Sequence, residues 1–94
     1  MSTPAMVDEA WTLSASVALR PEPFGALAYH FGTRQLSFLK TPQLVTVVRR
    51  LAESSTVGGA LAEAGVAREQ WPSYLEALGG LADSGMLVRQ GGAR

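Results

Sequence analysis

The sequence predicts a single α+β domain in which a three-stranded antiparallel sheet is followed by three helices. Three observations support this fold class. Residues 11–40 alternate apolar and polar side chains with a period of two, as half-buried strands do. Residues 41–85 instead repeat apolar side chains every three or four positions, as amphipathic helices do. The chain has 94 residues, which is enough to bury one modest core.

The centre of the predicted sheet is a hairpin over residues 24–40. Gly32-Thr33 is expected to be its two-residue turn, with Gly32 supplying the positive φ of a type II′ turn. This turn would place Tyr29 opposite Leu36 and Leu27 opposite Phe38. Side chains alternate between the two sides of a strand. One side would carry Leu27, Tyr29, Phe31, Leu36 and Phe38, and the other Ala26, Ala28, His30, Gln35, Ser37 and Leu39.

The segments before the hairpin complete the sheet. Residues 11–20 alternate in the same way and predict a first strand. Arg20-Pro21-Glu22-Pro23 predicts a connector, because proline fixes φ and lacks an N–H. In a simple meander, residues 34–40 then form an edge strand. Residues 1–10 and 90–94 show no periodicity, and we expect flexible tails on either side of a domain at 11–89.

Cap residues predict where the helices begin and end. Thr41-Pro42 suits the start of a first helix, and Thr56 and Gly65 bracket a short second helix. A third helix over residues 67–84 should start near Glu69, because proline is tolerated only in the first turn of a helix. Its apolar stripe comprises Trp71, Tyr74, Leu75, Leu78, Leu81 and Ala82. The short extended segment after Gly85 gives this last part the pattern of a winged helix.

Composition and charge limit the possible functions. Eight acidic residues balance eight basic ones, which predicts no attraction to nucleic acid or to an anionic membrane. The chain has no cysteine, which excludes a disulfide, a zinc–thiolate site and a thiol nucleophile. No apolar run approaches the roughly 18 residues of a membrane span, and the N-terminus lacks signal-peptide features. We therefore expect a cytoplasmic protein that needs no cofactor.

Two other function classes have weaker support. His30 is the only histidine, but no catalytic triad or metal-ligand spacing surrounds it, so we predict no enzyme and interpret His30 as an exposed or half-exposed strand residue. The winged-helix pattern also suggests a small DNA-binding regulator. A recognition helix should be basic, whereas the acidic residues of the third helix (Glu69, Glu76 and Asp83) outnumber Arg68.

Peptide binding fits the predicted edge strand better. Gln35–Leu39 contains no proline, glycine or charge that would block pairing with another strand. A peptide could add there as a further strand, unless the third helix or the N-terminal segment covers the edge. Net backbone hydrogen bonds return only about 1 kcal/mol each, whereas ordering a residue costs about 1–2 kcal/mol. A bound peptide must therefore also bury apolar side chains, and the third helix could supply the wall.

Several stretches closely resemble the family of mycofactocin peptide chaperones, MftB. The resemblance is carried most clearly by residues 17–40, 47–52, 74–78 and 84–89, and as a whole it covers nearly the whole chain apart from the two tails. This family is one of the RiPP recognition elements, which are small winged-helix-like domains similar to the chaperone PqqD. The resemblance implies a PqqD-like domain that holds the leader of a ribosomally made precursor peptide. The leader would lie as an extra strand beside the third strand and against the third helix.

The resemblance also implies a site and partners. The implied peptide-binding residues are Arg34, Gln35, Leu36, Ser37, Phe38, Leu39, Lys40, Trp71, Tyr74, Leu75 and Leu78. The implied partners are the mycofactocin precursor peptide and a radical SAM enzyme that modifies its C-terminal Val-Tyr and carries the iron–sulfur cluster. An open edge could also pair with a second copy when no peptide is bound. We hypothesise that the proline-rich segment at 20–24 helps to dock the enzyme.

Overall fold

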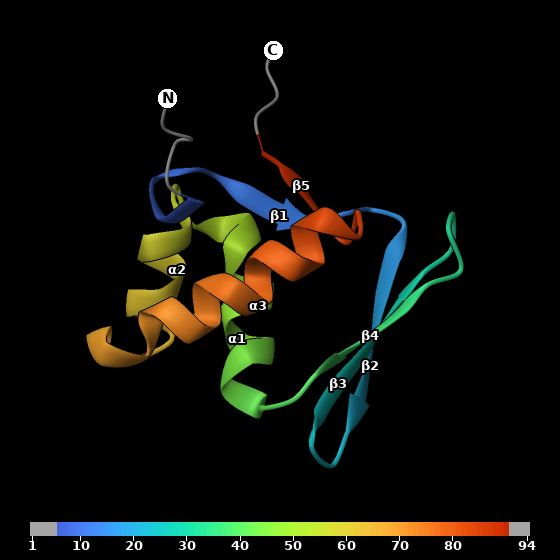
Figure 1. Ribbon diagram of the computed structural model, residues 1–94, viewed down its shortest axis with the longest axis horizontal. Helices are drawn as coiled ribbons and strands as arrows, with labels where there is room; N and C mark the ends of the chain where they lie inside the picture. The colour runs from blue at the N-terminus through green and yellow to red at the C-terminus, as the bar shows by residue number, and fades with distance from the viewer. Residues whose placement is uncertain (1–5, 91–94) are drawn as a thin grey trace.

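A computed structural model describes residues 6–90 as two antiparallel sheets and three α-helices (Figure 1). The larger sheet has the strand order β2 (Val17–Glu22), β3 (Gly25–His30) and β4 (Leu36–Leu39). The smaller one pairs β1 (Trp11–Leu13) with β5 (Leu87–Arg89). The helices are α1 (Pro42–Arg50), α2 (Val57–Glu63) and α3 (Trp71–Asp83). Three short 3₁₀ segments complete the described chain: η1 (Met6–Asp8), η2 (Leu51–Glu53) and η3 (Arg68–Gln70). The predicted fold class is confirmed.

The helix ends lie where the cap residues predict them. The Thr41 hydroxyl accepts a hydrogen bond from the Leu44 N–H at 3.1 Å, and that of Thr56 accepts one from the Gly59 N–H at 3.0 Å. These bonds satisfy N–H groups that have no partner within the first turn. Gly65 and Gly85 follow α2 and α3 with φ of 79° and 81°, a conformation that favours glycine.

The hydrophobic core lies between the helices and one face of the larger sheet. That face presents Ala26, Ala28 and Leu39, all at most 1% exposed. The two alanines are small, so α1 can pack directly against β3. Leu78 of α3 is fully buried in the same core. The sheet therefore has one core face and one outward face, and the outward face carries the aromatic side chains.

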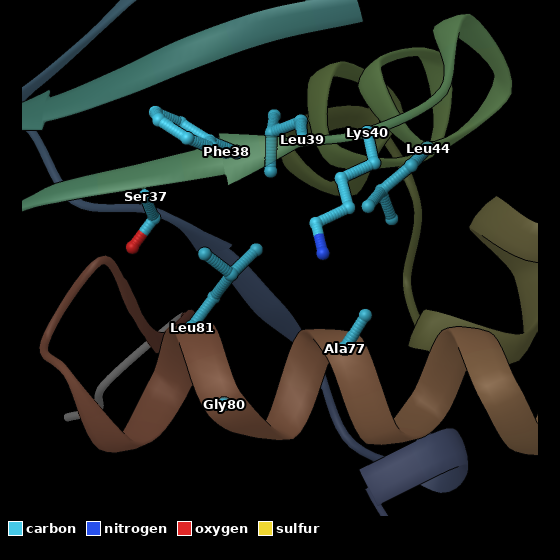
Figure 2. Close-up of a pocket in the computed structure, with 8 residues that line it drawn as sticks. All are labelled: Ser37, Phe38, Leu39, Lys40, Leu44, Ala77, Gly80 and Leu81. Carbon is cyan, nitrogen blue, oxygen red and sulfur yellow. The ribbon is translucent and has the colours of Figure 1, made fainter.

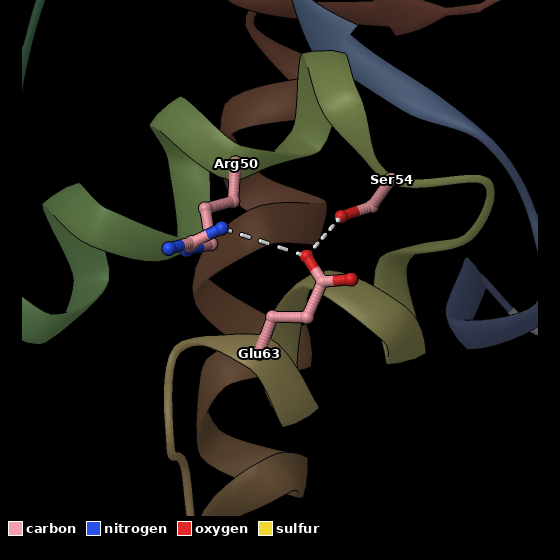
Figure 3. A network of polar contacts seen from close by, with 3 residues as sticks. All are labelled: Arg50, Ser54 and Glu63. Atoms are coloured by element: carbon pink, nitrogen blue, oxygen red, sulfur yellow. Dashed lines mark hydrogen bonds and ion pairs between the residues drawn. The ribbon is translucent and has the colours of Figure 1, made fainter.

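A polar contact joins the ends of α1 and α2 on the outside of this core (Figure 3). The Glu63 carboxylate accepts a hydrogen bond from the nearly buried Ser54 hydroxyl at 3.1 Å. The same oxygen lies 3.7 Å from a guanidinium nitrogen of Arg50. This pair is half-exposed and contributes little to stability by itself, but it satisfies the Ser54 hydroxyl.

The hairpin has the predicted register but not the predicted turn. Tyr29 pairs with Leu36 and Leu27 with Phe38, as expected. The loop, however, spans residues 31–34, is closed by the hydrogen bond from the His30 N–H to the Gln35 carbonyl, and has its positive φ at Arg34 rather than at Gly32. The His30 Nδ1 atom explains the wider loop, because it accepts the N–H groups of Gly32 (3.0 Å) and Thr33 (3.1 Å). Both loops have the same centre, so the register is unchanged.

The predicted first strand is two strands. A turn at Ser14–Ser16 divides it, with the Val17 N–H bonded to the Ser14 carbonyl at 3.0 Å. Hydrophobic alternation continues through the turn, so periodicity alone does not reveal the break. β1 then leaves the hairpin and pairs with β5.

The predicted connector is also shorter than expected, because β2 continues to Glu22 and only Pro23-Phe24 forms the turn.

The ends of the described chain pack on the domain. The Glu9 carbonyl accepts a hydrogen bond from the Val57 N–H at 2.9 Å. The Gln90 side chain donates to the carbonyls of Trp11 and Leu51. Residues 6–10 and 90 of the predicted tails thus lie against the domain, and the remaining parts of those tails (1–5 and 91–94) lie outside the described residues. None of the helices at 6–90 is long and apolar enough to cross a membrane.

Gly25 allows β3 and the end of β4 to approach closely, since an added Cβ would collide with the Leu39 carbonyl oxygen. We expect Gly25→Ala to lower the free energy of unfolding by about 1–3 kcal/mol, as overpacking does. Urea denaturation measures this change. In the control Gly79→Ala, the new methyl meets no atom within 4 Å, and roughly 0.5–1 kcal/mol of added stability is expected. Equal responses of the two variants would contradict the close approach.

Candidate peptide-binding site

The outer edge of β4 has unpaired backbone groups. β4 is a terminal strand of its sheet. The His30–Gln35 hydrogen bond sets the phase of the ladder. Because hydrogen-bonded pairs alternate in an antiparallel ladder, Ser37 and Leu39 bond to β3, while the N–H and C=O groups of Leu36 and Phe38 point away from the sheet. These outward groups are a template for one more strand.

The opposite edge of the sheet is less suitable. The hydrogen bond from the Phe31 N–H to the Ser16 carbonyl sets the phase of the β2–β3 ladder. By the same alternation, Val17, Leu19 and Pro21 turn their backbone groups outward on β2. Pro21 has no N–H to donate, and proline is a common device for blocking an edge. The missing donor also explains why Pro21 is tolerated inside a strand.

A groove lies beside the β4 edge, between this strand and α3 (Figure 2). Its volume is about 470 Å³. Its lining residues are Ser37, Phe38, Leu39 and Lys40 from β4 and the residue after it, Leu44 from α1, and Ala77, Gly80 and Leu81 from α3. α3 thus forms a wall of the groove instead of pairing with the edge. The 3₁₀ segment at Met6–Asp8 packs on α2 and α3 and does not pair with β4.

Two of the three α3 residues in the groove lining are small. Ala77 and Gly80 line the groove, and a Cβ added at Gly80 would have no atom within 4 Å. A smaller hollow of about 140 Å³ adjoins the groove and is lined by Thr41, Leu44, Ser73, Tyr74 and Ala77. Ser73, Ala77 and Gly80 follow one another at helical spacing, next to the apolar stripe. This row of small residues is the sequence feature that could have indicated which side of α3 lines the groove. The predicted site residues do not include it.

The structure brings only some of the predicted residues together. Ser37, Phe38, Leu39 and Lys40 line the groove, and Tyr74 lines the adjoining hollow, where its hydroxyl donates to the Gln43 side-chain oxygen at 3.1 Å. Arg34 and Gln35 lie at the exposed loop end, and Leu36 lies on the opposite face of the strand from the groove.

The other three helix residues lie away from the groove lining. Leu78 is fully buried, and Leu75 packs against the core. The Trp71 indole N–H donates to the Val66 carbonyl at 3.0 Å, and the Arg68 guanidinium lies 4.5 Å from its ring centre. These three side chains hold α3 in position.

The outward face of the sheet is strongly apolar. Phe31 and Phe38 are both 60% exposed and Leu36 is 57% exposed. The Phe24 and Phe38 rings lie 5.9 Å apart, and the Tyr29 and Phe31 rings 5.3 Å apart. We call this surface the outer aromatic face; it comprises Phe24, Leu27, Tyr29, Phe31, Leu36 and Phe38. A contiguous exposed patch of this kind is typical of an interaction surface.

The residues of the site are suited to binding a ligand. Among residues 6–90, no three His, Cys, Asp or Glu side chains gather closely enough to hold a metal ion. His30 accepts two backbone N–H groups through Nδ1, which gives it a structural role in the loop. An apolar groove beside outward N–H and C=O groups suits an extended peptide.

The comparison with known protein families agrees with this geometry. Residues 10–88 match the family described as the "Peptide chaperone MftB family". The chain belongs to the peptide chaperone MftB family. The resemblance noted in the sequence is thereby confirmed, and a peptide chaperone role with a peptide partner follows from membership of the MftB family.

Three curated relatives, each named "Peptide chaperone MftB", are similar to the chain. The protein of Mycolicibacterium smegmatis is 57% identical over 86% of this chain and 79% of its own length. That of Mycobacterium ulcerans is 55% identical over 88% and 76%, and that of Mycobacterium tuberculosis is 52% identical over 86% and 74%. No solved structure matches the chain significantly.

A substitution of Leu78 tests whether this predicted site residue stabilises the core instead of contacting a ligand. We expect Leu78→Ala to lower the free energy of unfolding by about 2–5 kcal/mol, because it removes a fully buried side chain and leaves a cavity. Chemical denaturation measures the loss. Glu76→Ala, at an exposed position of the same helix, should change stability by less than about 0.5 kcal/mol. A Leu78→Ala protein as stable as the Glu76→Ala control would contradict the core assignment.

Proposed function

We propose that this chain binds the leader segment of the mycofactocin precursor peptide as an added strand on β4. It then presents the peptide to a radical SAM maturase. The observation that carries the proposal is the open β4 edge, with the outward backbone groups of Leu36 and Phe38, beside an apolar groove. Membership of the peptide chaperone MftB family supports it.

The two faces of an added strand would meet different surfaces. Side chains of a strand alternate, so one set of leader residues would point into the groove toward Ala77, Gly80 and Leu81. The other set would lie beside Leu36 and Phe38 on the outer aromatic face. Both surfaces are apolar. Each apolar leader side chain that is fully buried contributes about 1.5–3 kcal/mol, and this offsets the cost of ordering the peptide.

The predicted site residues would then have separate roles. Residues 34–40 would supply the edge and its flanks. Tyr74 would line the extension of the groove, while Trp71, Leu75 and Leu78 would act indirectly by holding α3. Ala77, Gly80, Leu81 and Leu44 complete the proposed site.

The outer aromatic face is the surface that we propose for the enzyme. A leader strand on β4 would lengthen this face and leave its centre exposed. The Arg20–Glu22 ion pair (3.3 Å) lies on the same face at its β2 side, next to the Pro23-Phe24 turn. In this proposal the chain itself is not catalytic, acts in the cytoplasm and needs no cofactor, because the maturase supplies the iron–sulfur chemistry.

Two alternatives to peptide binding can be tested by experiment. A second copy of the chain could occupy β4 when no peptide is present, which sedimentation with and without peptide would reveal. DNA binding has less support, because Glu76 and Asp83 are exposed on α3 and a recognition helix needs basic residues. A gel shift without salt-sensitive binding would exclude it.

An amide-shift titration with the precursor peptide tests the site. Strand addition predicts shifts concentrated at residues 35–40 and at Ala77, Gly80 and Leu81, saturating at one peptide per chain. Shifts confined to other surfaces, or no shifts, would overturn the proposal.

A pair of glycine variants sharpens this test. Gly80→Leu should fill the groove and weaken peptide binding by about tenfold or more, corresponding to at least about 1.4 kcal/mol. Gly79→Leu is the matched control, because Gly79 is not part of the groove lining. Both substitutions should raise helix stability by about 0.5–1 kcal/mol. Isothermal titration measures the affinity, and equal affinities of the two variants would contradict a groove-bound peptide.

The enzyme-docking part is tested separately. Replacing both Arg20 and Glu22 with alanine should weaken binding of the maturase about threefold to tenfold and leave peptide affinity unchanged, because neither residue lines the groove. In the matched control, Arg50 and Glu63, which form the ion pair between α1 and α2, are both replaced with alanine. Biosensor binding to the purified enzyme measures both. Unchanged enzyme binding in the Arg20/Glu22 variant would remove this role.

A further inference from the structure

One side chain of the groove differs chemically from the rest. Of the eight lining residues, Lys40 is the only charged one, and Ser37 is the only other polar one. The Lys40 side chain leaves the end of β4 and extends into the gap toward Ala77 on α3 (Figure 2). An ammonium group thus lies at one end of an otherwise apolar groove.

Lys40 has no carboxylate partner in the described part of the chain. The ion pairs within residues 6–90 are Arg20–Glu22, Arg50–Glu63 and Arg89–Glu9. None of these is in the groove. Lys40 is exposed when the groove is empty. A strand added along β4 would cover part of the groove around it, so a carboxylate of that strand would meet the ammonium group with less water between them than at an open surface.

We propose that Lys40 binds a carboxylate side chain of the leader and thereby fixes the register of the added strand. This inference rests on the proposed strand addition at β4. It assigns to the leader an Asp or Glu whose side chain shares the groove face and lies at the Lys40 end. Apolar side chains would occupy the groove positions nearer Ser37.

Strand addition needs such a register signal. Backbone hydrogen bonds are the same for every residue, so the ladder alone does not choose a register. A slip of one residue exchanges the two faces, so leader side chains that fit the groove would lie on the open outer aromatic face instead. A slip of two residues keeps the faces and moves the peptide by about 7 Å. Lys40 is the only charged residue in the groove lining, so it can distinguish the correct register from one shifted by two residues.

A double-mutant cycle tests the proposal. The protein variants are wild type, Lys40→Gln and Lys40→Arg. The probes are the precursor peptide and versions in which each Asp or Glu is changed singly to Asn or Gln. We expect Lys40→Gln to weaken binding of the unmodified peptide about tenfold and Lys40→Arg to preserve it. One amide peptide should bind wild type about tenfold more weakly and bind Lys40→Gln without further loss. Arg49→Gln, an exposed cation on α1, is the control for general charge effects.

The outcomes separate this inference from the proposed function. If the titration maps the peptide to β4 and α3 but Lys40→Gln binds within twofold of wild type, the register role fails and strand addition stands. Equal losses for every amide peptide, or an equal loss in Arg49→Gln, would also overturn it, because they indicate non-specific attraction. If wild type does not bind the precursor at all, the proposed function itself fails.

Discussion

The pairing of β3 with β4 is the constraint on which the rest of this molecule depends. The His30–Gln35 hydrogen bond sets the phase of the ladder, and that phase decides which backbone groups of β4 remain outside the sheet. The same pairing turns Ala26, Ala28 and Leu39 toward the helices. Because the alanines let α1 pack close to the sheet, Leu44 of α1 is part of the groove lining. One register thus determines the core, the open edge and the aromatic face together.

Much of this arrangement follows from local sequence signals. Thr41, Thr56, Gly65 and Gly85 mark helix ends that the structure reproduces, because capping depends on residues within one turn. The register of the hairpin was also predictable, although its turn was not. The His30 Nδ1 atom accepts hydrogen bonds from the N–H groups of Gly32 and Thr33, and these bonds determine the loop conformation instead of the preference of Gly32 for a positive φ. Turn propensities of single residues do not include a hydrogen bond from a side chain outside the turn.

The missed features depend on contacts between distant segments. β1 separates from β2 because it pairs with β5, almost 80 residues later, and alternation within one strand does not reveal its partner. The groove wall was missed for a related reason. An apolar stripe identifies the buried side of α3, but the angle at which the helix crosses the sheet decides which flank faces the gap. That flank carries Ala77 and Gly80, whereas Leu78 is in the core.

Pro21 has a consequence for how many partners the sheet can accept. Its missing N–H interrupts the β2 edge, which leaves β4 as the better edge for the strand addition proposed above. A sheet that could grow at both sides would link neighbouring molecules into open chains, since head-to-tail contacts without closure produce filaments. With one suitable edge, the sheet would be monovalent under the proposed function: each molecule would take up one strand, and the assembly would stop there. A carrier that must hand over a single flexible substrate benefits from this limit, which one imino acid imposes.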